Sequence, residues 1–167
     1  LHKSGLNIPI LYDCDVVEQQ LVMSNVPGQP LIELLNDDSI DDATVNKHLR
    51  TAGKSVRMLH RQAIVHGDLS TNNIMITPEG EAVLIDFGLA KIEFETELYG
   101  IDLHVLFEIL GASHPHREGA MEAVLEGYAQ CEEDLGPAPR TSGGDPVSMS
   151  DVLERFDLIR TRVRYHG

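Results

Sequence analysis

The sequence predicts an α+β fold that is mainly helical and contains a few short β-hairpins. Two long segments carry apolar residues at three- and four-residue spacing, which is typical of amphipathic helices. Between them lie short β-like runs separated by turn residues such as PEG. With 167 residues, of which 42% are hydrophobic, the chain is long enough for one domain with a substantial core.

Composition disfavours several classes of protein. No apolar run approaches the roughly 18 residues of a membrane span, and the N-terminal LHKSGLNIP has neither the basic start nor the apolar stretch of a signal peptide. We therefore expect a soluble, cytoplasmic protein. A formal net charge of −14, from 27 acidic and 13 basic residues, disfavours general nucleic-acid binding by the chain as a whole.

Neither the cysteines nor the histidines have the spacing of a zinc site. Cys14 and Cys131 lie far apart without a CxxC pair, so they are most simply buried thiols and form no disulfide scaffold. His114 and His116 flank a proline without carboxylate or cysteine partners, and we interpret them as exposed turn residues.

The charge balance reverses at the C-terminal end. Four arginines fall in the last thirteen residues: Arg155, Arg160, Arg162 and Arg164. They either place cations at a helix C-terminus, where the helix dipole favours them, or contact RNA or a partner protein. Both interpretations stay open on this pattern.

The N-terminal part predicts a hairpin followed by helices. IPILYDCD (8–15) and VVEQQLVMSNV (16–26) have the pattern of two strands joined by a tight acidic turn, VPGQP then interrupts it, and LIELLND predicts a short helix. Asp41 or Asp42 can cap a long helix that ends at about Gln62. Its predicted core stripe is Val45, Leu49, Ala52, Val56, Leu59 and Ala63.

The rest of the chain predicts a small β cluster and then helices. Three β-like pieces come first: IVHGD, NIMIT and EAVLIDF. Helical patterns follow at about 100–112, at about 117–130, and from Ser148 or Ser150 to about Arg164. The apolar face of the last helix consists of Val152, Phe156, Ile159 and Val163.

Two polar segments in this β cluster predict a catalytic function. HGDLSTNN (66–73) lies between AIV and IMI, and IDFG places Asp86 eighteen residues after Asp68. Alone, Asp68 could cap a turn, and Asp-Phe-Gly could end any strand. In this order, on either side of a predicted hairpin, they resemble the catalytic and metal-binding loops of the protein-kinase superfamily.

The kinase resemblance implies roles for individual residues. Asp68 is expected to accept or orient the proton of the attacking hydroxyl. Asn73 and Asp86 are expected to hold Mg²⁺ against the phosphates of ATP. The motif's count from Asp68 selects Asn73, and the adjacent Asn72 is expected to stabilise the loop.

A nucleotide site is implied by the segment MSNVPGQPL, which resembles the kinase hinge that reads the adenine ring. Its expected ATP contacts are Met23, Ser24 and Val26. Met75 and Ile85 are expected to form the apolar floor beneath the adenine, with ordinary core packing as the alternative for both.

Departures from ordinary protein kinases narrow the resemblance. Gly67 stands where those kinases have an arginine, Ser70 replaces a basic residue, and no A-P-E motif follows. Asp102 corresponds to the buried aspartate that braces the catalytic loop, and it lies only 14 positions after Gly88. We therefore expect no full activation segment and little surface for a peptide substrate.

These departures, with LIDFGLA, ETELYGIDLHVLFEILGASHP and an arginine-bearing C-terminal helix, resemble the small atypical kinase subunit of the KEOPS (EKC) tRNA-modification complex. The resemblance implies an ATP-dependent kinase or ATPase that supports threonylcarbamoyladenosine formation on tRNA, with Ser/Thr protein kinase activity secondary. Its implied partners are a threonylcarbamoyl-transferase subunit, separate or fused, the other KEOPS subunits, and tRNA through the complex. Family tails are basic, which favours contacts by Arg160, Arg162 and Arg164.

The first part of the chain lacks several kinase motifs. No glycine-rich phosphate loop, V-A-I-K lysine or glutamate to pair with it is recognisable before Asp68. We therefore expect residues 1–26 to be the last strands of a kinase N-lobe and the hinge, residues 27–167 to be the C-lobe, and activity to be weak or absent without the rest of the N-lobe. Two alternatives remain: a small-molecule phosphotransferase of the aminoglycoside or choline kinase type, and a non-catalytic C-lobe that binds a partner.

Overall fold

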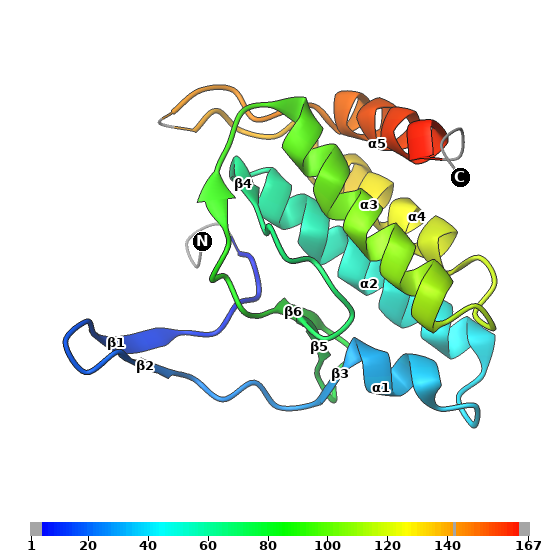
Figure 1. The fold of residues 1–167 in the computed structure, drawn as a ribbon, viewed down its shortest axis with the longest axis horizontal. Coiled ribbons are helices and arrows are strands. Elements are labelled where there is room, and N and C mark those ends of the chain that lie inside the picture. Colours follow the sequence, from blue (N-terminus) through cyan, green and yellow to red (C-terminus); the bar gives the residue numbers. More distant parts are fainter. Residues whose placement is uncertain (1–4, 142, 164–167) are drawn as a thin grey trace.

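The structure, a computed structural model that describes residues 5–141 and 143–163, places a group of helices beside short antiparallel strands (Figure 1). The helices are α1 (Leu31–Asn36), α2 (Asp42–His60), α3 (Thr96–Ser113), α4 (Ala120–Leu135) and α5 (Met149–Val163). The strands are β1 (Leu11–Asp15), β2 (Gln20–Met23), β3 (Gln29–Pro30), β4 (Ile64–Val65), β5 (Ile74–Ile76), β6 (Ala82–Leu84) and β7 (Lys91–Ile92). The predicted α+β class, mainly helical with short hairpins, is confirmed.

The strands form three small sheets, with the orders β1-β2, β3-β5-β6 and β4-β7. In the central sheet Ile74 pairs with Leu84 and Ile76 with Ala82. The sequence predicted an interruption at VPGQP, but Gln29–Pro30 in this stretch pairs with β5 as an edge strand. Proline lacks a backbone N–H and is tolerated at a sheet edge, so its presence does not exclude this short strand.

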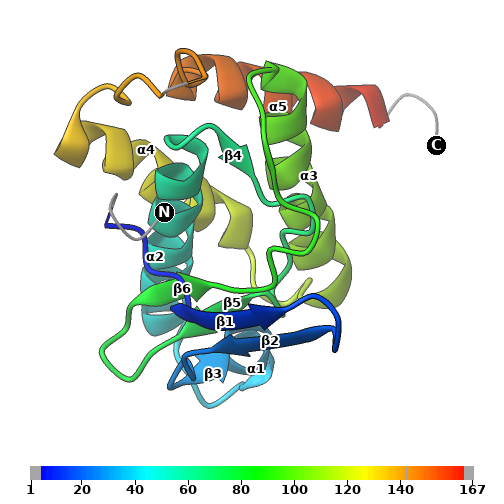
Figure 2. The same cartoon turned by 90° about the vertical axis from the view of Figure 1, so that its left-hand side faces the viewer.

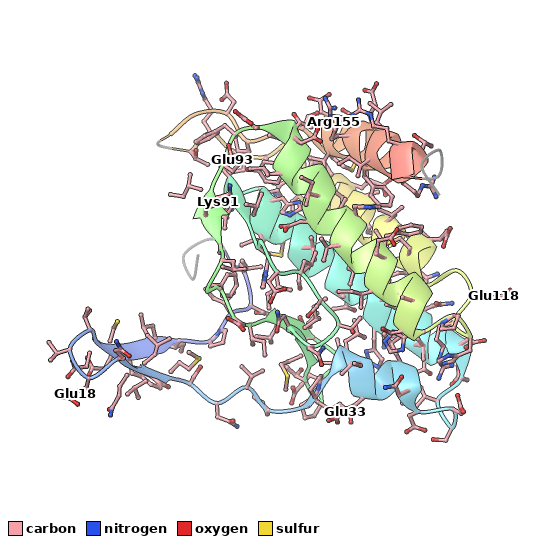
Figure 3. The ribbon with its side chains drawn as sticks, in the orientation of Figure 1. Glu18, Glu33, Lys91, Glu93, Glu118 and Arg155 are labelled. Carbon is pink, nitrogen blue, oxygen red and sulfur yellow. The ribbon has the colours of Figure 1, made fainter. Side chains whose placement is uncertain are left out.

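The β1–β2 hairpin extends away from the rest of the molecule (Figure 1). At its tip Asp15 accepts hydrogen bonds from the backbone N–H groups of Val17 and Glu18, each at 2.9 Å, and Glu18 marks this tip in Figure 3. Every residue of both strands is exposed. Cys14 is therefore exposed, contrary to the prediction, whereas Cys131 is buried.

Helix α2 forms the centre of the core. Its N-cap is Asp41, whose carboxylate accepts the backbone N–H of Thr44 at 2.9 Å, as the capping pattern predicted. All six residues of the predicted stripe are buried, although Ala63 lies beyond the helix end with φ +56°. The stripe is therefore core, and the helix ends two residues earlier than predicted, at His60.

Helices α2 and α4 approach each other closely through two glycines. A Cβ added at Gly53 would lie 1.9 Å from the carbonyl oxygen of Val124, and one added at Gly127 would lie 1.9 Å from that of Arg50. Since no real Cβ fits at such a distance, both positions require glycine for this helix pair to pack.

Helix α5 packs on α3, at the end of the molecule opposite the sheet β3-β5-β6 in Figures 1 and 2. Val152 and Phe156 of its predicted apolar face are buried, and the Phe156 ring meets Phe107 edge-on at 5.9 Å. Ile159 is half-buried, and the side chain of Val163 lies outside what the structure describes. Over residues 5–141 and 143–163, no helix is both long and apolar enough to span a membrane.

The histidine pair after α3 differs from its prediction. His114 is the C-cap of α3 and is 1% exposed, so it is not an exposed turn residue. His116, which is exposed, and Arg117 both donate hydrogen bonds to the carbonyl oxygen of Leu35 in α1, at 3.0 and 3.1 Å. These bonds hold the turn against α1.

The glycine contact between α2 and α4 generates a stability prediction. Gly127→Ala should lower the free energy of unfolding by about 3 kcal/mol, because the methyl group forces the helix backbones apart. Gly111→Ala is the matched control in α3, where an added Cβ meets nothing within 4 Å; it should be neutral or stabilising by about 0.5–1 kcal/mol. Urea unfolding of both variants measures the difference, and equal effects would contradict the close approach.

Candidate active site

The HGDLSTNN and IDFG segments lie side by side because β5 and β6 form the hairpin between them. HGDLSTNN runs from the end of β4 to the start of β5, and IDFG follows β6. The backbone N–H of Ile85 donates to the carbonyl oxygen of Asn73 at 3.0 Å. The His66 ring donates from Nε2 to the carbonyl oxygen of Ile85 at 2.9 Å. These two bonds join the segments directly.

Asp68 and Asn73 are in contact within the first segment. The Asn73 amide donates from Nδ2 to the carbonyl oxygen of Asp68 at 2.8 Å and to its carboxylate Oδ2 at 3.1 Å. Both bonds use the amide nitrogen and leave the amide oxygen Oδ1 of Asn73 free to accept a ligand. Asn72 is exposed, and its side chain makes no hydrogen bond to the described residues. The prediction that Asn72 stabilises the loop is therefore not supported by a side-chain contact.

Asp86 has an unusual backbone conformation. Its φ is +59°, in the left-handed region that costs a non-glycine residue about 1–2 kcal/mol. The backbone N–H of Gly88 donates to its carboxylate at 3.4 Å, and the side chain is otherwise exposed. Such outliers cluster at functional sites, because the surrounding structure must hold the conformation.

A cavity of about 600 Å³ lies between the β1–β2 hairpin and this site. All five residues predicted to contact the nucleotide line it: Met23, Ser24, Val26, Met75 and Ile85. Asp86 also lines the cavity, together with Pro9 and Asn25, which the sequence reasoning missed. Asn25 could have been found from its place between two predicted contacts, whereas Pro9 gives no signal in the sequence.

The segment that follows β2 leaves backbone groups available at this cavity. Ser24 is already paired with Ile10, since its N–H donates to the Ile10 carbonyl and its hydroxyl accepts the Ile10 N–H, both at 2.8 Å. The N–H groups of Asn25 and Val26 have no acceptor among the described residues. These two N–H groups could therefore donate hydrogen bonds to a heterocycle bound in the cavity.

We call HGDLSTNN (66–73) the catalytic loop, after the kinase loop that it resembles. A buried carboxylate holds this loop from behind. Asp102, 3% exposed, accepts the backbone N–H of His66 at 2.6 Å and that of Gly67 at 2.9 Å. Burial alone raises the pKa of this carboxyl, but hydrogen bonds from the His60 ring and these two N–H groups outweigh burial and bring the pKa below its ordinary value. Asp102 is therefore an anion at neutral pH, as its predicted bracing role requires.

Gly67 is required where ordinary protein kinases have arginine. Its φ is +80°, and an added Cβ would lie 2.5 Å from the carbonyl oxygen of Leu89. The segment after IDFG therefore crosses the catalytic loop at a distance that only glycine permits.

That segment is held by backbone pairing. β7 pairs with β4, the Glu93 N–H donates to the Ala63 carbonyl at 2.9 Å, and the Tyr99 hydroxyl donates to the Glu93 carbonyl. Lys91 and Glu93, labelled in Figure 3, come within 3.8 Å of each other at β7. These backbone and side-chain bonds hold the short segment in place.

The C-terminal arginines differ in what they contact. Arg155 pairs with Glu97 at 3.1 Å. Arg160 pairs with Asp157 at 2.9 Å and its guanidinium lies over the rings of Phe107 and Phe156. Arg162 is exposed, with no ion pair to the described residues. Arg164 lies outside the described residues.

The donor set near Asp68 fits magnesium better than zinc. Asp86 offers a carboxylate and Asn73 an amide oxygen, which are the oxygen ligands that Mg²⁺ prefers. Over residues 5–141 and 143–163, no group of three or more His, Cys, Asp or Glu side chains could hold a metal ion. Mg²⁺ commonly binds through one or two protein oxygens and completes its shell with substrate phosphates and water. Asn73 and Asp86 would suffice for that mode.

Comparison with known proteins agrees with this geometry. The protein kinase domain model matches residues 10–100. The KEOPS complex subunit Bud32 of Pyrococcus abyssi is 37% identical over 163 residues, which cover 96% of this chain and 67% of that protein. A bifunctional tRNA threonylcarbamoyladenosine biosynthesis protein of Methanosarcina acetivorans is 32% identical over 98% of this chain, but only 25% of its own length is covered. The EKC/KEOPS complex subunit BUD32 of Gibberella zeae is 31% identical over 77% of this chain and 55% of its own length.

The Asp102 brace predicts a defined response to acid. Asp102→Asn should lower the free energy of unfolding at pH 7 by about 3 kcal/mol, because the amide turns a donor toward neighbours that are themselves donors. The wild-type pKa lies below the unfolded value of about 3.9, so the contribution of Asp102 is complete above that pH and is lost as pH falls through the folded pKa. The gap between the two proteins should therefore stay constant from pH 7 to 5 and narrow below about pH 4.

Urea unfolding at several pH values measures this gap. The exposed Asp38, whose side chain makes no hydrogen bond or ion pair to the described residues, provides the control Asp38→Asn, which should change stability by less than about 0.5 kcal/mol. A gap that stays constant below pH 3 would show that the carboxylate charge is not what holds the loop.

Proposed function

Because this chain belongs to the protein kinase family, in the group of the small KEOPS subunit Bud32, we propose that it is the ATP-using subunit of a complex that forms threonylcarbamoyladenosine on tRNA. The family makes it a kinase- or ATPase-type enzyme. The chain spans about two thirds of the Pyrococcus relative and about a quarter of the bifunctional relative. The activity and partners of the whole protein are therefore part of this proposal.

The observation that carries the proposal is that backbone pairing brings the Asp68–Asn73 contact next to Asp86, at the wall of a largely apolar cavity. Asp68 and Asn73 are hydrogen-bonded to each other, the Asn73 backbone is bonded to Ile85, and Asp86 follows Ile85 at the cavity wall. A nucleotide with its base in the cavity would direct its phosphates toward these oxygens.

Each residue has a proposed task in phosphoryl transfer. Asp68 accepts or orients the proton of the attacking water or hydroxyl, and the Asn73 amide fixes that carboxylate through the 3.1 Å hydrogen bond. The Asn73 amide oxygen and the Asp86 carboxylate hold Mg²⁺, which when bound neutralises charge on the phosphates. Asp86 has a left-handed backbone, and it is exposed at the cavity wall.

The hinge segment is proposed to bind the adenine ring of ATP. Met23, Ser24 and Val26 would contact the base from one side and Met75 and Ile85 from the other, with the free N–H groups of Asn25 and Val26 as donors. Residues 1–26 would then be the end of an N-lobe with its hinge. Residues 27–167 would be the C-lobe.

Water is a more plausible main acceptor of the phosphoryl group than a protein hydroxyl. In the short segment after Asp86, strand β7 already pairs with β4, so little free strand edge remains for a peptide substrate to pair with. Ser/Thr protein phosphorylation would then be secondary. Residues 1–22 contain neither a glycine-rich loop nor a V-A-I-K lysine, so these 167 residues alone should bind ATP weakly.

The proposed partners are a threonylcarbamoyl-transferase subunit, other KEOPS subunits and tRNA, in the cytoplasm. The formal charge of −14 opposes direct binding of tRNA over most of the surface. Arg162 and Arg164, and to a lesser degree the paired Arg160, are the cations we propose to contact the partner or the RNA.

Loss of one metal ligand should remove the activity. Asp86→Asn should lower Mg²⁺-dependent ATP hydrolysis by about 100-fold or more, whereas the exposed Asp38→Asn should leave it unchanged. Turnover is measured on residues 1–167 and on the complete gene product, each with and without the transferase partner and tRNA. We expect turnover to rise when both are added.

The controls distinguish the alternative functions. Turnover that is indifferent to partner and tRNA but rises with an aminoglycoside or choline would favour a small-molecule phosphotransferase. Turnover that is the same in Asp86→Asn and wild type would exclude the proposed role of Asp86, and no turnover in any of these mixtures would leave a partner-binding module.

A further inference from the structure

A chain of buried hydrogen bonds runs from α4 to the back of the catalytic loop. Its members are Glu132 and Tyr128 of α4, Arg57 and His60 of α2, and Asp102 of α3. Arg57 donates from Nε to Glu132 at 2.9 Å and lies 3.5 Å from the Tyr128 hydroxyl. That hydroxyl is 2.8 Å from His60 Nδ1, and His60 Nε2 is 3.3 Å from Asp102.

Arg57 and Asp102 limit the directions of the hydrogen bonds between them. Arg57 can only donate, and an ionised Asp102 can only accept. The Tyr128 hydroxyl therefore accepts from Arg57 and donates to His60 Nδ1. With a neutral ring, His60 carries its proton on Nε2 and donates it to Asp102, so one tautomer is compatible with every bond between Arg57 and Asp102.

Burial supports this arrangement. Arg57, His60 and Tyr128 are each 0% exposed. Burial lowers the pKa of the His60 ring, more than Asp102 and its hydrogen bond raise it, and burial also raises the pKa of the Tyr128 hydroxyl. Both side chains are therefore neutral near pH 7, which is the state that the bond directions require.

We propose that Tyr128 is a positioning residue for the catalytic loop, because its hydroxyl fixes the His60 ring and thereby orients Asp102 against the loop. Asp102 passes this orientation to the backbone of His66 and Gly67, which immediately precede Asp68. Tyr128 touches no proposed ligand and acts only through His60.

The helix contact beside Tyr128 determines its reach. The preceding residue, Gly127, lets the α4 backbone approach the Arg50 carbonyl in α2 closely. At this separation the Tyr128 hydroxyl reaches His60 at 2.8 Å. A partner that shifted α4 relative to α2 would therefore change the support of the catalytic loop.

The first test is a measurement on the unmodified chain. Nitrogen NMR of the histidine rings should find His60 neutral, with its proton on Nε2 and Nδ1 accepting a hydrogen bond. A charged His60, or a proton on Nδ1, would overturn the inference without any substitution.

The second test removes one oxygen atom. In Tyr128→Phe we expect hydrogen exchange at the His66 and Gly67 amides to rise about tenfold, corresponding to one lost hydrogen bond, while the amides of the α2 core are much less affected. Tyr99→Phe is the matched buried control, because Tyr99 packs edge-on against His60 at 4.8 Å but donates its hydroxyl to Glu93. It should not change exchange at His66 and Gly67, and the exposed Tyr12→Phe should change nothing.

The activity measurement rests on the proposed function, and the exchange measurement does not. If the chain hydrolyses ATP, Tyr128→Phe should lower kcat about tenfold and leave KM for ATP within about twofold, because the cavity is untouched. Faster exchange at the two amides without any ATP turnover in wild type would support the positioning role and count against the proposed function alone. Exchange that rises equally across the protein would overturn the inference, since Tyr128 would then contribute only packing.

Discussion

The candidate site depends on the buried carboxylate of Asp102. A loop rich in polar groups has backbone N–H groups that no strand satisfies, and two of them, at His66 and Gly67, donate to this one side chain. An unpaired N–H at this depth would cost about 1–3 kcal/mol. The carboxylate therefore stabilises the loop and fixes the backbone next to Asp68 in the same contact. The α2–α4 pair behind it extends this support into the core.

The second constraint is the β5–β6 hairpin, which brings the HGDLSTNN and IDFG segments into contact although they are separate in sequence. Antiparallel pairing of Ile74 with Leu84 brings the residues beyond each strand end together. Asn73 and Ile85 are therefore hydrogen-bonded neighbours, and Asp86 comes next in the left-handed conformation. Phosphoryl transfer needs little covalent chemistry from a protein and much positioning, which a short, fully paired hairpin can supply.

The parts of this structure that sequence reasoning predicted have local patterns, and the parts it missed do not. The α2 stripe, its Asp41 cap and the spacing from Asp68 to Asp86 can be read along the chain. The burial of His114, the strand at Gln29–Pro30 and the Arg57–Tyr128–His60 chain each depend on segments that are distant in sequence. Periodicity assigned such residues to a helix face or a loop, but it carries no information about which buried polar atoms meet.

Two departures from ordinary protein kinases turn out to be one change. In the sequence, the glycine at position 67 and the short segment after Gly88 are separate observations. In the structure a Cβ added at position 67 would lie only 2.5 Å from the carbonyl oxygen of Leu89. The short segment crosses the catalytic loop so closely that no side chain fits at position 67, where ordinary protein kinases have an arginine. Backbone pairing of β7 with β4 holds the segment across the loop, and the glycine at position 67 makes room for it.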